Sequence, residues 1–340
     1  MVDKLFIEKV KSALNIVNVV ESFTHLHKAG VNYKGVCPFH DDHTPSMVVS
    51  PSRQTYHCFV CGASGDVIAF VQHHLNLSFI EALRWCATLA GLEFPQKEMS
   101  PEEEAKYKQK EAQRIAIEAA AKFFQKNLSQ AESFLNNRGY KLDDKALSDF
   151  GVGYAPVGNV AMNTLTTAGY SLDRLKEVDV VGSTEGRFYD RFRDRVMFPF
   201  YDMQGHIIGF SGRIITPREG VGKYVNTGET PLFTKGKHIF GLYQARKAIG
   251  KKGYAYLVEG QFDVMSLHKV GVEHVIGGSG TAFTDDQIKL LLRFTDSIVM
   301  VYDADAAGVK ASLKNCELLL KAGAKVKCIR LPKGTDPDEF

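Results

Sequence analysis

The spacing of four cysteine and histidine residues constrains the first hundred residues more than any other feature. Cys37 and His40 form one close pair, Cys58 and Cys61 form a second, and 17 residues separate the two pairs. Two such knuckles joined by a hairpin-length insert present three thiolates and one imidazole as a tetrahedron, which is the geometry of a structural zinc ribbon. The sequence therefore predicts one structural Zn²⁺, with no coordination position left for catalysis.

The other three cysteines, Cys86, Cys316 and Cys328, each stand alone in an apolar helical or strand pattern, so we expect them in the core. The N-terminal segment mixes charged residues into an apolar helical period and contains neither a signal peptide nor a membrane-spanning run. These features predict a cytoplasmic protein with no membrane partner, in which thiols stay reduced and clustered cysteines bind metal.

Basic and aromatic side chains alternate around the predicted ribbon. Such a mixture neutralises phosphates and stacks unpaired bases, which is typical of single-stranded nucleic-acid binding. For Phe39 and Phe59, aromatic packing around a small metal core is an equally good interpretation, whereas Arg53 at the hairpin tip favours nucleic acid. The residues are Lys28, Tyr33, Lys34, Phe39, Arg53, Tyr56 and Phe59, with Arg53 at the expected tip.

Turn and composition signals divide the chain into four parts. Residues 1–98 hold the zinc ribbon and two amphipathic helical patterns, and we interpret them as a DNA-binding domain. Residues 99–125 predict a linker helix, because Ser100 and Glu103 have the spacing of a capping box. Short alternating apolar runs with many glycines then predict a mixed α+β subdomain over residues 126–250.

Positive charge is concentrated in the second half of that third part and in the two residues that follow it. Between Arg187 and Lys252 there are 13 Lys and Arg against 5 Asp and Glu, while the whole chain carries only +3. A basic segment flanked by acidic sequence suggests a surface for a polyanion, although a solvated charged face is the more common outcome for charge runs.

Strand and helix patterns alternate in residues 251–340. This alternation predicts a Rossmann-like parallel sheet with right-handed crossovers. The fold class is therefore α/β and α+β in one multidomain chain: an N-terminal zinc ribbon, a mixed α+β basic subdomain and a parallel sheet.

Carboxylates follow three of the predicted parallel strands. Because ligands bind at the carboxyl ends of such strands, we expect these side chains to converge at one edge of the sheet. Several carboxylates at one place need a divalent cation, and Mg²⁺ or Mn²⁺ would suit phosphoryl transfer. A plain alternative is that Asp305 caps the following helix. The residues are Glu259, Asp303, Asp305, Asp336 and Asp338.

Longer strings give the chain a family resemblance. GVCPFHDDHTPS and YHCFVCGASGD resemble the zinc motif of bacterial-type DNA primases, and FRDRVMFPF, GFSGR and KYVNTGETPLFTKGKHIFGLY resemble the basic strands of their polymerase domain. YLVEGQFDV, YDADAAG and DPDEF resemble their TOPRIM acidic motifs. The resemblance covers essentially the whole chain, and the strings lie in the family order.

The resemblance implies a DNA primase, a DNA-directed RNA polymerase that makes short RNA primers for replication by two-metal nucleotidyl transfer. It implies single-stranded DNA as template, ribonucleoside triphosphates as substrates, and a replicative helicase as partner through a C-terminal region beyond DPDEF, so that the TOPRIM subdomain, 251–340, is expected to be incomplete. Glu259, Asp303 and Asp305 would be catalytic, and with Asp336 they would bind Mg²⁺ or Mn²⁺. The expected contacts to template or nucleotide are Arg138, Arg213, Lys223, Tyr224 and Lys235, together with Arg53 of the zinc domain.

This chain departs from the family pattern at Ala304, Ala306, Gln261 and Gly278. Two other functions fit part of the sequence. A non-catalytic zinc and TOPRIM protein of the recombination-mediator type would lack the basic middle domain, and a D-x-D phosphatase would carry Gly-Thr where Ala306 and Ala307 stand.

Overall fold

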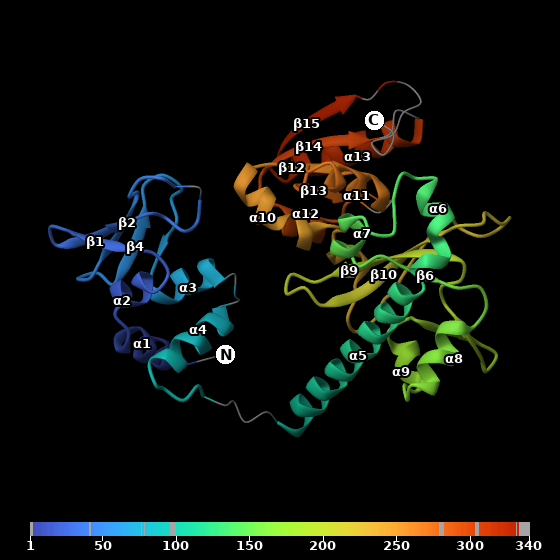
Figure 1. Cartoon of the computed structure of the whole chain (residues 1–340), viewed down its shortest axis with the longest axis horizontal. Coiled ribbons are helices and arrows are strands. Elements are labelled where there is room, and N and C mark those ends of the chain that lie inside the picture. Colours follow the sequence, from blue (N-terminus) through green and yellow to red (C-terminus); the bar gives the residue numbers. More distant parts are fainter. Residues whose placement is uncertain are drawn as a thin grey trace. The chain divides into compact units, whose positions relative to one another are not determined.

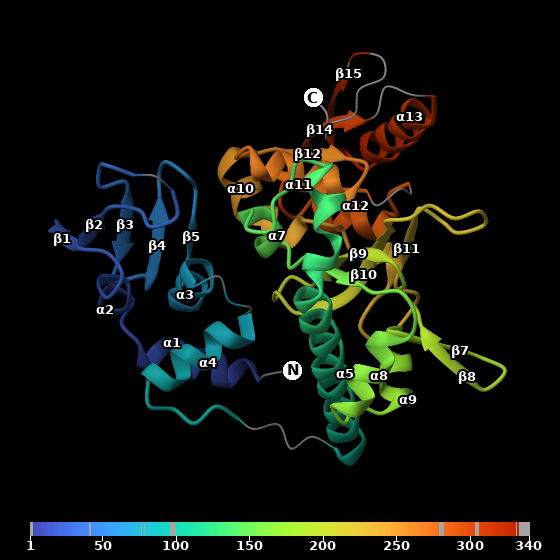
Figure 2. The same ribbon diagram turned by 45° about the vertical axis from the view of Figure 1, so that its right-hand side comes forward.

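The structure is a computed structural model, and it describes residues 3–40, 42–75, 77, 79–95, 100–278, 282–302, 306–330 and 332. The chain folds into two compact units, residues 1–99 and residues 100–340, each of which has its own core. Both units are drawn in Figure 1 and, turned by 45°, in Figure 2. Within the described ranges no helix has both the length and the apolar character needed to span a membrane.

The described residues of the first unit form a small antiparallel sheet and four helices. Asp3 and Asn15 cap α1 (Lys4–Ala13) and α2 (Ile16–Glu21) by accepting hydrogen bonds from the backbone N–H groups two residues ahead. The five strands pair in chain order: β1 (Leu26–Ala29), β2 (Asn32–Gly35), β3 (Met47–Ser50), β4 (Thr55–Cys58) and β5 (Ser64–Gly65). Helices α3 (Val67–Leu75) and α4 (Phe79–Leu89) follow. One face of the sheet is buried, because Val49 and Tyr56 pair across β3 and β4 and pack in the core.

The second unit begins with the long helix α5 (Pro101–Lys126). The capping box predicted at Ser100 and Glu103 is present, with both reciprocal hydrogen bonds formed. The amino-terminal half of α5 is exposed, whereas its carboxyl-terminal half packs into the core of the unit. That packing is close at Gly153, where an added Cβ would lie 2.5 Å from the backbone of Phe124.

Short helices and two antiparallel sheets form the rest of the mixed α+β region. The larger sheet has the order β11-β10-β9-β6, and the smaller is the hairpin β7–β8. The elements are η1 (Leu128–Ala131), α6 (Glu132–Asn136), α7 (Lys145–Asp149), β6 (Gly153–Ala155), α8 (Val160–Thr167), α9 (Leu172–Glu177), β7 (Val181–Thr184), β8 (Arg187–Asp190), β9 (Arg195–Tyr201), β10 (Ile207–Ile214), β11 (Tyr224–Asn226), η2 (Lys235–Lys237) and α10 (Leu242–Lys252).

The last region is the parallel sheet that the sequence predicts. Its strands are hydrogen-bonded in the order β13-β12-β14-β15, all parallel. The elements are β12 (Ala255–Val258), α11 (Gln261–Lys269), β13 (Val275–Gly277), α12 (Asp285–Leu291), β14 (Ser297–Tyr302), α13 (Ala306–Lys321) and β15 (Lys325–Arg330). The alternation of strand and helix is therefore confirmed, as is the fold class.

The two faces of the parallel sheet belong to different cores. Leu257, Ile276 and Met300 share one face and pack with residues of α10, α12 and α13. Val258 and Val301 lie in the other core, which also holds α11 and the antiparallel sheet. The mixed region and the parallel sheet are thus joined by a continuous apolar core, in which the rings of Phe198 and Phe262 lie 5.0 Å apart.

Candidate metal and nucleic-acid sites

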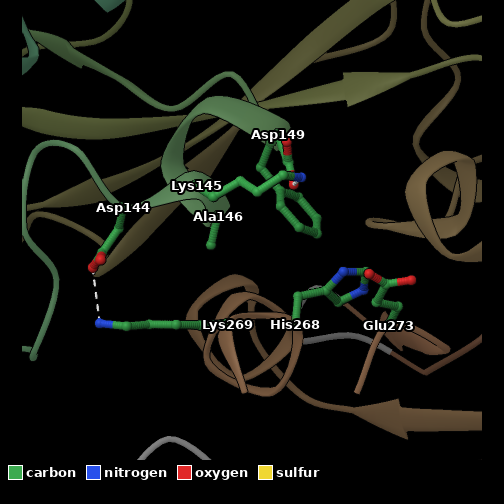
Figure 3. A pocket seen from close by; sticks show the side chains of 8 residues that line it. Asp144, Lys145, Ala146, Asp149, His268, Lys269 and Glu273 are labelled. Atoms are coloured by element: carbon green, nitrogen blue, oxygen red, sulfur yellow. Dashed lines mark hydrogen bonds and ion pairs between the residues drawn. The ribbon is translucent and has the colours of Figure 1, made fainter. Parts of the chain in front are cut away.

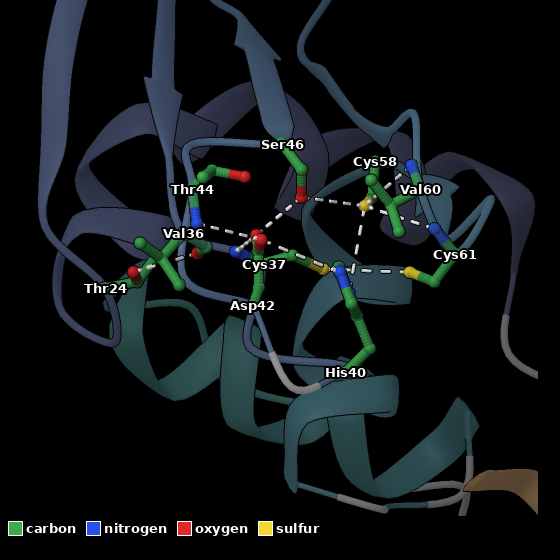
Figure 4. Close-up of polar contacts among 10 residues, drawn as sticks. All are labelled: Thr24, Val36, Cys37, His40, Asp42, Thr44, Ser46, Cys58, Val60 and Cys61. Carbon is green, nitrogen blue, oxygen red and sulfur yellow. Dashed lines mark hydrogen bonds and ion pairs between the residues drawn. The ribbon is translucent and has the colours of Figure 1, made fainter.

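Cys37, His40, Cys58 and Cys61 lie together in the first unit, with one ligand atom from each within 4.8 Å of the others (Figure 4). The two Sγ atoms of Cys37 and Cys61 are 3.8 Å apart, and His40 Nδ1 is 4.0 Å from Cys58 Sγ. Three sulfurs and one imidazole nitrogen at these separations match the donor set of a tetrahedral structural zinc site. The four residues fit Zn²⁺ and leave no position open.

Asp42 interacts with two of these four residues, Cys37 and His40. Its carboxylate accepts hydrogen bonds from the Cys37 backbone N–H (2.8 Å) and the Ser46 hydroxyl (2.5 Å), and lies 3.8 Å from His40 Nε2. These hydrogen bonds lower the pKa of Asp42 to about 2. When a carboxylate interacts with the ring nitrogen of a ligating histidine that does not bind the metal, it orients the ring and strengthens metal binding.

The surroundings of Cys58 favour its thiolate form. Burial opposes its ionisation, but hydrogen bonds from the backbone N–H groups of Cys61 and Val60 and from the Ser46 hydroxyl prevail and lower its pKa to about 6. Burial instead raises the pKa of Cys37 to about 12. A bound cation would reverse this effect, because a coordinating thiol loses its proton.

The zinc unit presents part of the predicted basic and aromatic set to solvent. Arg53 is exposed in the turn between β3 and β4, and the Phe59 ring is 74% exposed. Phe39 packs against the buried Tyr56 ring at 5.5 Å between ring centres, so the alternative of core packing is correct for Phe39 and not for the exposed Phe59. Lys34 and His57 lie on the outer face of the sheet, where they pair in register with Val48.

The carboxyl edge of the parallel sheet is described in part. Glu259 directly follows β12, and Asp303, Asp305, Asp336 and Asp338 lie outside the described residues. Strands β12 and β14 are hydrogen-bonded neighbours, so their carboxyl ends are adjacent. Burial raises the pKa of Tyr302, the last residue of β14, and the charge of Glu259 adds to this effect. Glu259 therefore lies close to the strand that leads directly into Asp303.

Three of the predicted basic and aromatic residues gather beside Glu259. The Arg138 guanidinium lies over the Phe262 ring of α11, 4.7 Å from its centre. Arg213 and Tyr224 are cross-strand partners on β10 and β11, with the guanidinium 5.3 Å from the ring centre. The Tyr224 hydroxyl reaches the start of α11, where a Cβ on Gly260 would lie 4.0 Å from it.

The electrostatics of Tyr224 confirm that these groups are close to one another. Burial raises its pKa to about 12, while the positive charges of Arg213 and Arg138 act against that rise and the negative charge of Asp263 adds to it. Asp263 is nearly buried and accepts a 2.7 Å hydrogen bond from the Gly260 backbone N–H. Charges from three separate elements therefore meet next to the residue that follows β12.

Arg213 has unused capacity to bind an anion. Its Nε is buried and has no hydrogen-bond partner among the described residues. A buried N–H without an acceptor costs free energy, which an incoming oxygen acceptor would recover. A phosphate oxygen suits this guanidinium because the group donates in a planar fork.

Lys223 and Lys235 are both exposed, Lys223 just before β11 and Lys235 at the start of η2. The segment of Lys235 is fixed to the parallel-sheet region, because the Thr284 hydroxyl donates to the Gly236 carbonyl and Gln287 Nε2 donates to the His238 carbonyl at 2.7 Å. The structure thus holds Lys235 beside α12.

Sequence reasoning missed an arginine-lined cavity of about 410 Å³. Arg195 at its base is buried and donates to three backbone carbonyls, so its role is structural. Arg191, Arg193 and Arg218 line the rest and are exposed. The signal was available in the sequence DRFRDR, where arginines recur at every second position.

A second cavity, of about 310 Å³, lies between α7 and the end of α11 (Figure 3). Lys269 forms a 2.8 Å ion pair with Asp144 at one side, and His268 and Glu273 line the other. None of the predicted site residues lines it.

Comparison with known families covers nearly the whole chain. Residues 2–102 match the family described as a CHC2 zinc finger, residues 120–246 match the N-terminal domain of the DNA primase catalytic core, and residues 256–340 match a Toprim-like domain.

Individual relatives point to the same family as these domain matches. DNA primase from Clostridium acetobutylicum is 38% identical over 98% of this chain and 56% of its own length, and DNA primase from Aquifex aeolicus is 36% identical over 98% and 66%. Among solved structures, the zinc-binding and RNA polymerase domains of the Aquifex aeolicus primase superpose with a TM-score of 0.63 at 36% identity, covering 98% of this chain and 81% of that one. A primase domain from Pseudomonas aeruginosa gives 0.62 at 35% identity, over 67% and 74%.

A CHC2 zinc finger followed by a primase catalytic core domain and a Toprim-like domain defines the class of Toprim-containing proteins with an N-terminal zinc ribbon. Within that class, the chain belongs to the bacterial DNA primase family. It spans about half to two thirds of the length of the curated relatives described above.

Proposed function

We propose that this chain is the zinc-binding and polymerase part of a DNA primase, which makes short RNA primers from ribonucleoside triphosphates on single-stranded DNA. The observation that carries the proposal is the gathering of Arg138, Arg213 and Tyr224 at the start of α11, directly beside Glu259. Cationic groups next to a carboxylate at the carboxyl edge of a parallel sheet suit a triphosphate held with a divalent cation.

The carboxylates Glu259, Asp303, Asp305 and Asp336 would hold Mg²⁺ or Mn²⁺. Support comes from the pairing of β12 with β14, which brings Glu259 at the carboxyl end of β12 close to the strand that leads into Asp303. When bound, the divalent cation neutralises the phosphate charge that the carboxylates would otherwise repel.

The reaction joins a primer 3′ oxygen to the α-phosphorus of the incoming nucleotide, with pyrophosphate as the leaving group. Glu259, Asp303 or Asp305 would accept the proton of the 3′ hydroxyl, because in the sequence each follows within three residues the end of a parallel strand. Arg213 would donate to triphosphate oxygens through its unpaired Nε, and Arg138 would contribute a second positive charge.

The template would contact the exposed cations. Lys223, Lys235 and the arginine-lined cavity offer positive charge along the mixed α+β region. Arg53 and Phe59 of the zinc unit would contact phosphate and unpaired bases, with Zn²⁺ in a purely structural role. A solved structure of a primase catalytic domain, 31% identical over 68% of this chain, has single-stranded DNA bound.

Two further parts of the proposal rest on the family alone. A replicative helicase would be the partner of the complete protein, through a C-terminal region, and the cytoplasm would be its compartment. The recombination-mediator alternative is not favoured, because the primase core match at residues 120–246 occupies the place where such a protein has no domain.

The proposal is tested by de novo incorporation of labelled ribonucleotides on a set of single-stranded DNA templates with Mg²⁺ or Mn²⁺. Asp303→Ala should reduce synthesis at least about a hundredfold while DNA binding persists. The matched control is Asp296→Ala, because Asp296 precedes the same strand β14 at its amino end and pairs only with groups there. Undiminished synthesis in Asp303→Ala would refute the mechanism, and no product from the wild-type chain would refute the activity.

A further inference from the structure

Two cysteines outside the zinc site lie on adjoining elements of the Toprim region. Cys316 is half-buried on α13, and Cys328 is exposed on β15, which is an edge strand of the parallel sheet within the described residues. The expectation that Cys328 is a core residue is therefore wrong, since only one side of an edge strand is covered by a neighbour. Cys86 is fully buried in the first unit, as expected.

The strand register places Cys328 on the face of the sheet that α13 covers. Cys328 pairs with Met300 of β14, and paired residues of parallel strands point to the same face. Tyr302 shares that face because it lies two residues beyond Met300, and its hydroxyl accepts a 2.7 Å hydrogen bond from Asn315 of α13. Helix α13 therefore lies over the side chains of Met300, Tyr302 and Cys328.

Cys316 lies on the side of α13 that faces this sheet. It directly follows the buried Asn315 and packs against the core formed by Met300, Tyr302 and Leu319. Burial raises the pKa of Cys316, and its interaction with the Cys328 side chain raises it further. The helix and the strand beneath it thus bring the two thiols to the same layer, close enough to interact.

We propose that Cys316 and Cys328 form a redox-sensitive pair, which closes into an intramolecular disulfide when the protein meets a peroxide and so ties α13 to the edge strand β15. The proposal is independent of the function proposed above, because it concerns only the chemistry of the two thiols.

The chemistry balances with hydrogen peroxide as the oxidant. The exposed Cys328, as its thiolate, attacks one peroxide oxygen, which breaks the O–O bond and forms a sulfenic acid; the departing hydroxide takes up a proton to become water. The Cys316 sulfur then attacks the Cys328 sulfur, which forms the S–S bond and expels a second water. Two thiols and one peroxide thus yield one disulfide and two waters.

Exposure and pairing set this pair apart from the other cysteines. Oxidation needs access to the oxidant, and a resolving thiol nearby converts a sulfenic acid to a disulfide before further oxidation. Cys86 has neither access nor a thiol neighbour among the described residues, and the other three belong to the zinc site.

The test uses the full zinc-loaded chain, reduced, desalted and treated with hydrogen peroxide. Free thiols are then alkylated, and peptides are mapped by mass spectrometry before and after reduction. We expect one cross-linked peptide joining Cys316 to Cys328, formed at least about tenfold faster than Cys86 is lost. Dithiothreitol should reverse it. In Cys316→Ser, Cys328 should proceed instead to sulfinic acid.

The matched control moves the thiol to the other face of the sheet. In a Cys328→Ser background, Lys327→Cys places a thiol one residue earlier, opposite Val299 and away from α13. That variant should give no cross-link to Cys316, although its new thiol is exposed. The proposal is overturned if Cys316 and Cys328 are each oxidised without a cross-link, or if Lys327→Cys cross-links as fast as the wild type.

Discussion

The guanidinium of Arg138 lies over the ring of Phe262, 4.7 Å from its centre, and so fixes a cation from the mixed α+β region onto the first turn of a Toprim helix. Phe262 is itself held by the Phe198 ring of β9. Because Phe262 is only three residues from Glu259, the packing of two aromatic rings places a positive charge next to the proposed metal-binding edge.

Arg213 is expected to act in substrate binding rather than in folding. Arg213→Ala should lower kcat/KM for ribonucleotide incorporation by about a hundredfold, because its unpaired Nε is the donor proposed for the triphosphate. The control is Arg246→Ala, which removes a similar arginine from the Tyr243 ring on α10. Steady-state incorporation kinetics would decide, and equal losses in the two variants would count against the assignment.

Asp42 is expected to strengthen zinc binding without touching the metal. Asp42→Asn should weaken zinc affinity about 10- to 100-fold, since the carboxylate orients His40 and holds the Cys37 backbone. Competition with a chromogenic zinc chelator measures this. His57→Ala removes an exposed histidine beside Cys58 and should leave affinity as in the wild type; a similar loss there would mean that the sheet, and not Asp42, is responsible.

Tyr140 and Ser266 are expected to be coupled across the two regions of the second unit. Their hydroxyls are 2.6 Å apart, and Tyr140 is buried. A double-mutant cycle with Tyr140→Phe and Ser266→Ala should give a coupling free energy of about 0.5–1.5 kcal/mol. Urea unfolding followed by far-UV circular dichroism reports it, while the fluorescence of the single tryptophan, Trp85, follows the first unit and should not change. Additive effects would show that the pair is not coupled.

The second unit is expected to lose stability in mild acid. Burial lowers the pKa of His268, against the opposing charges of Glu273 and Asp149, and burial also lowers the pKa of His238 and His274. Below the unfolded value of about 6.5, the unfolded chain therefore binds more protons than the folded one. The contribution of these histidines to the free energy of unfolding is fully present above that pH. It is lost as the pH falls toward their pKa values in the folded state.

Between pH 7.5 and pH 5.5, the free energy of unfolding of the second unit should depend less steeply on pH in His268→Gln than in the wild type. Urea unfolding at several pH values would measure the slope. Identical slopes in the two proteins would show that His268 does not contribute.

Much of the fold follows from contiguous sequence. The spacing from Cys37 to Cys61 specifies a zinc ribbon, and Ser100 with Glu103 marks the start of α5, because metal coordination and helix capping depend on residues only a few positions or one hairpin apart. The parallel sheet follows from the alternation of patterns in residues 251–340. Phe39 and Phe59 show the limit: their residue types fit base stacking and core packing equally well, but Phe39 packs against Phe70 of α3 whereas the Phe59 ring is exposed.

The sequence by itself thus determined which four residues are candidate zinc ligands, the order of the folded regions and the family, since each is encoded in local spacing and long motifs. Only the tertiary structure decided that Arg138, Arg213 and Tyr224 meet beside Glu259, that four arginines line one cavity, and that Cys328 faces Cys316. These relationships join residues far apart in the chain. They depend on strand register and on the burial of aromatic faces between sheets, which are set when the whole core packs.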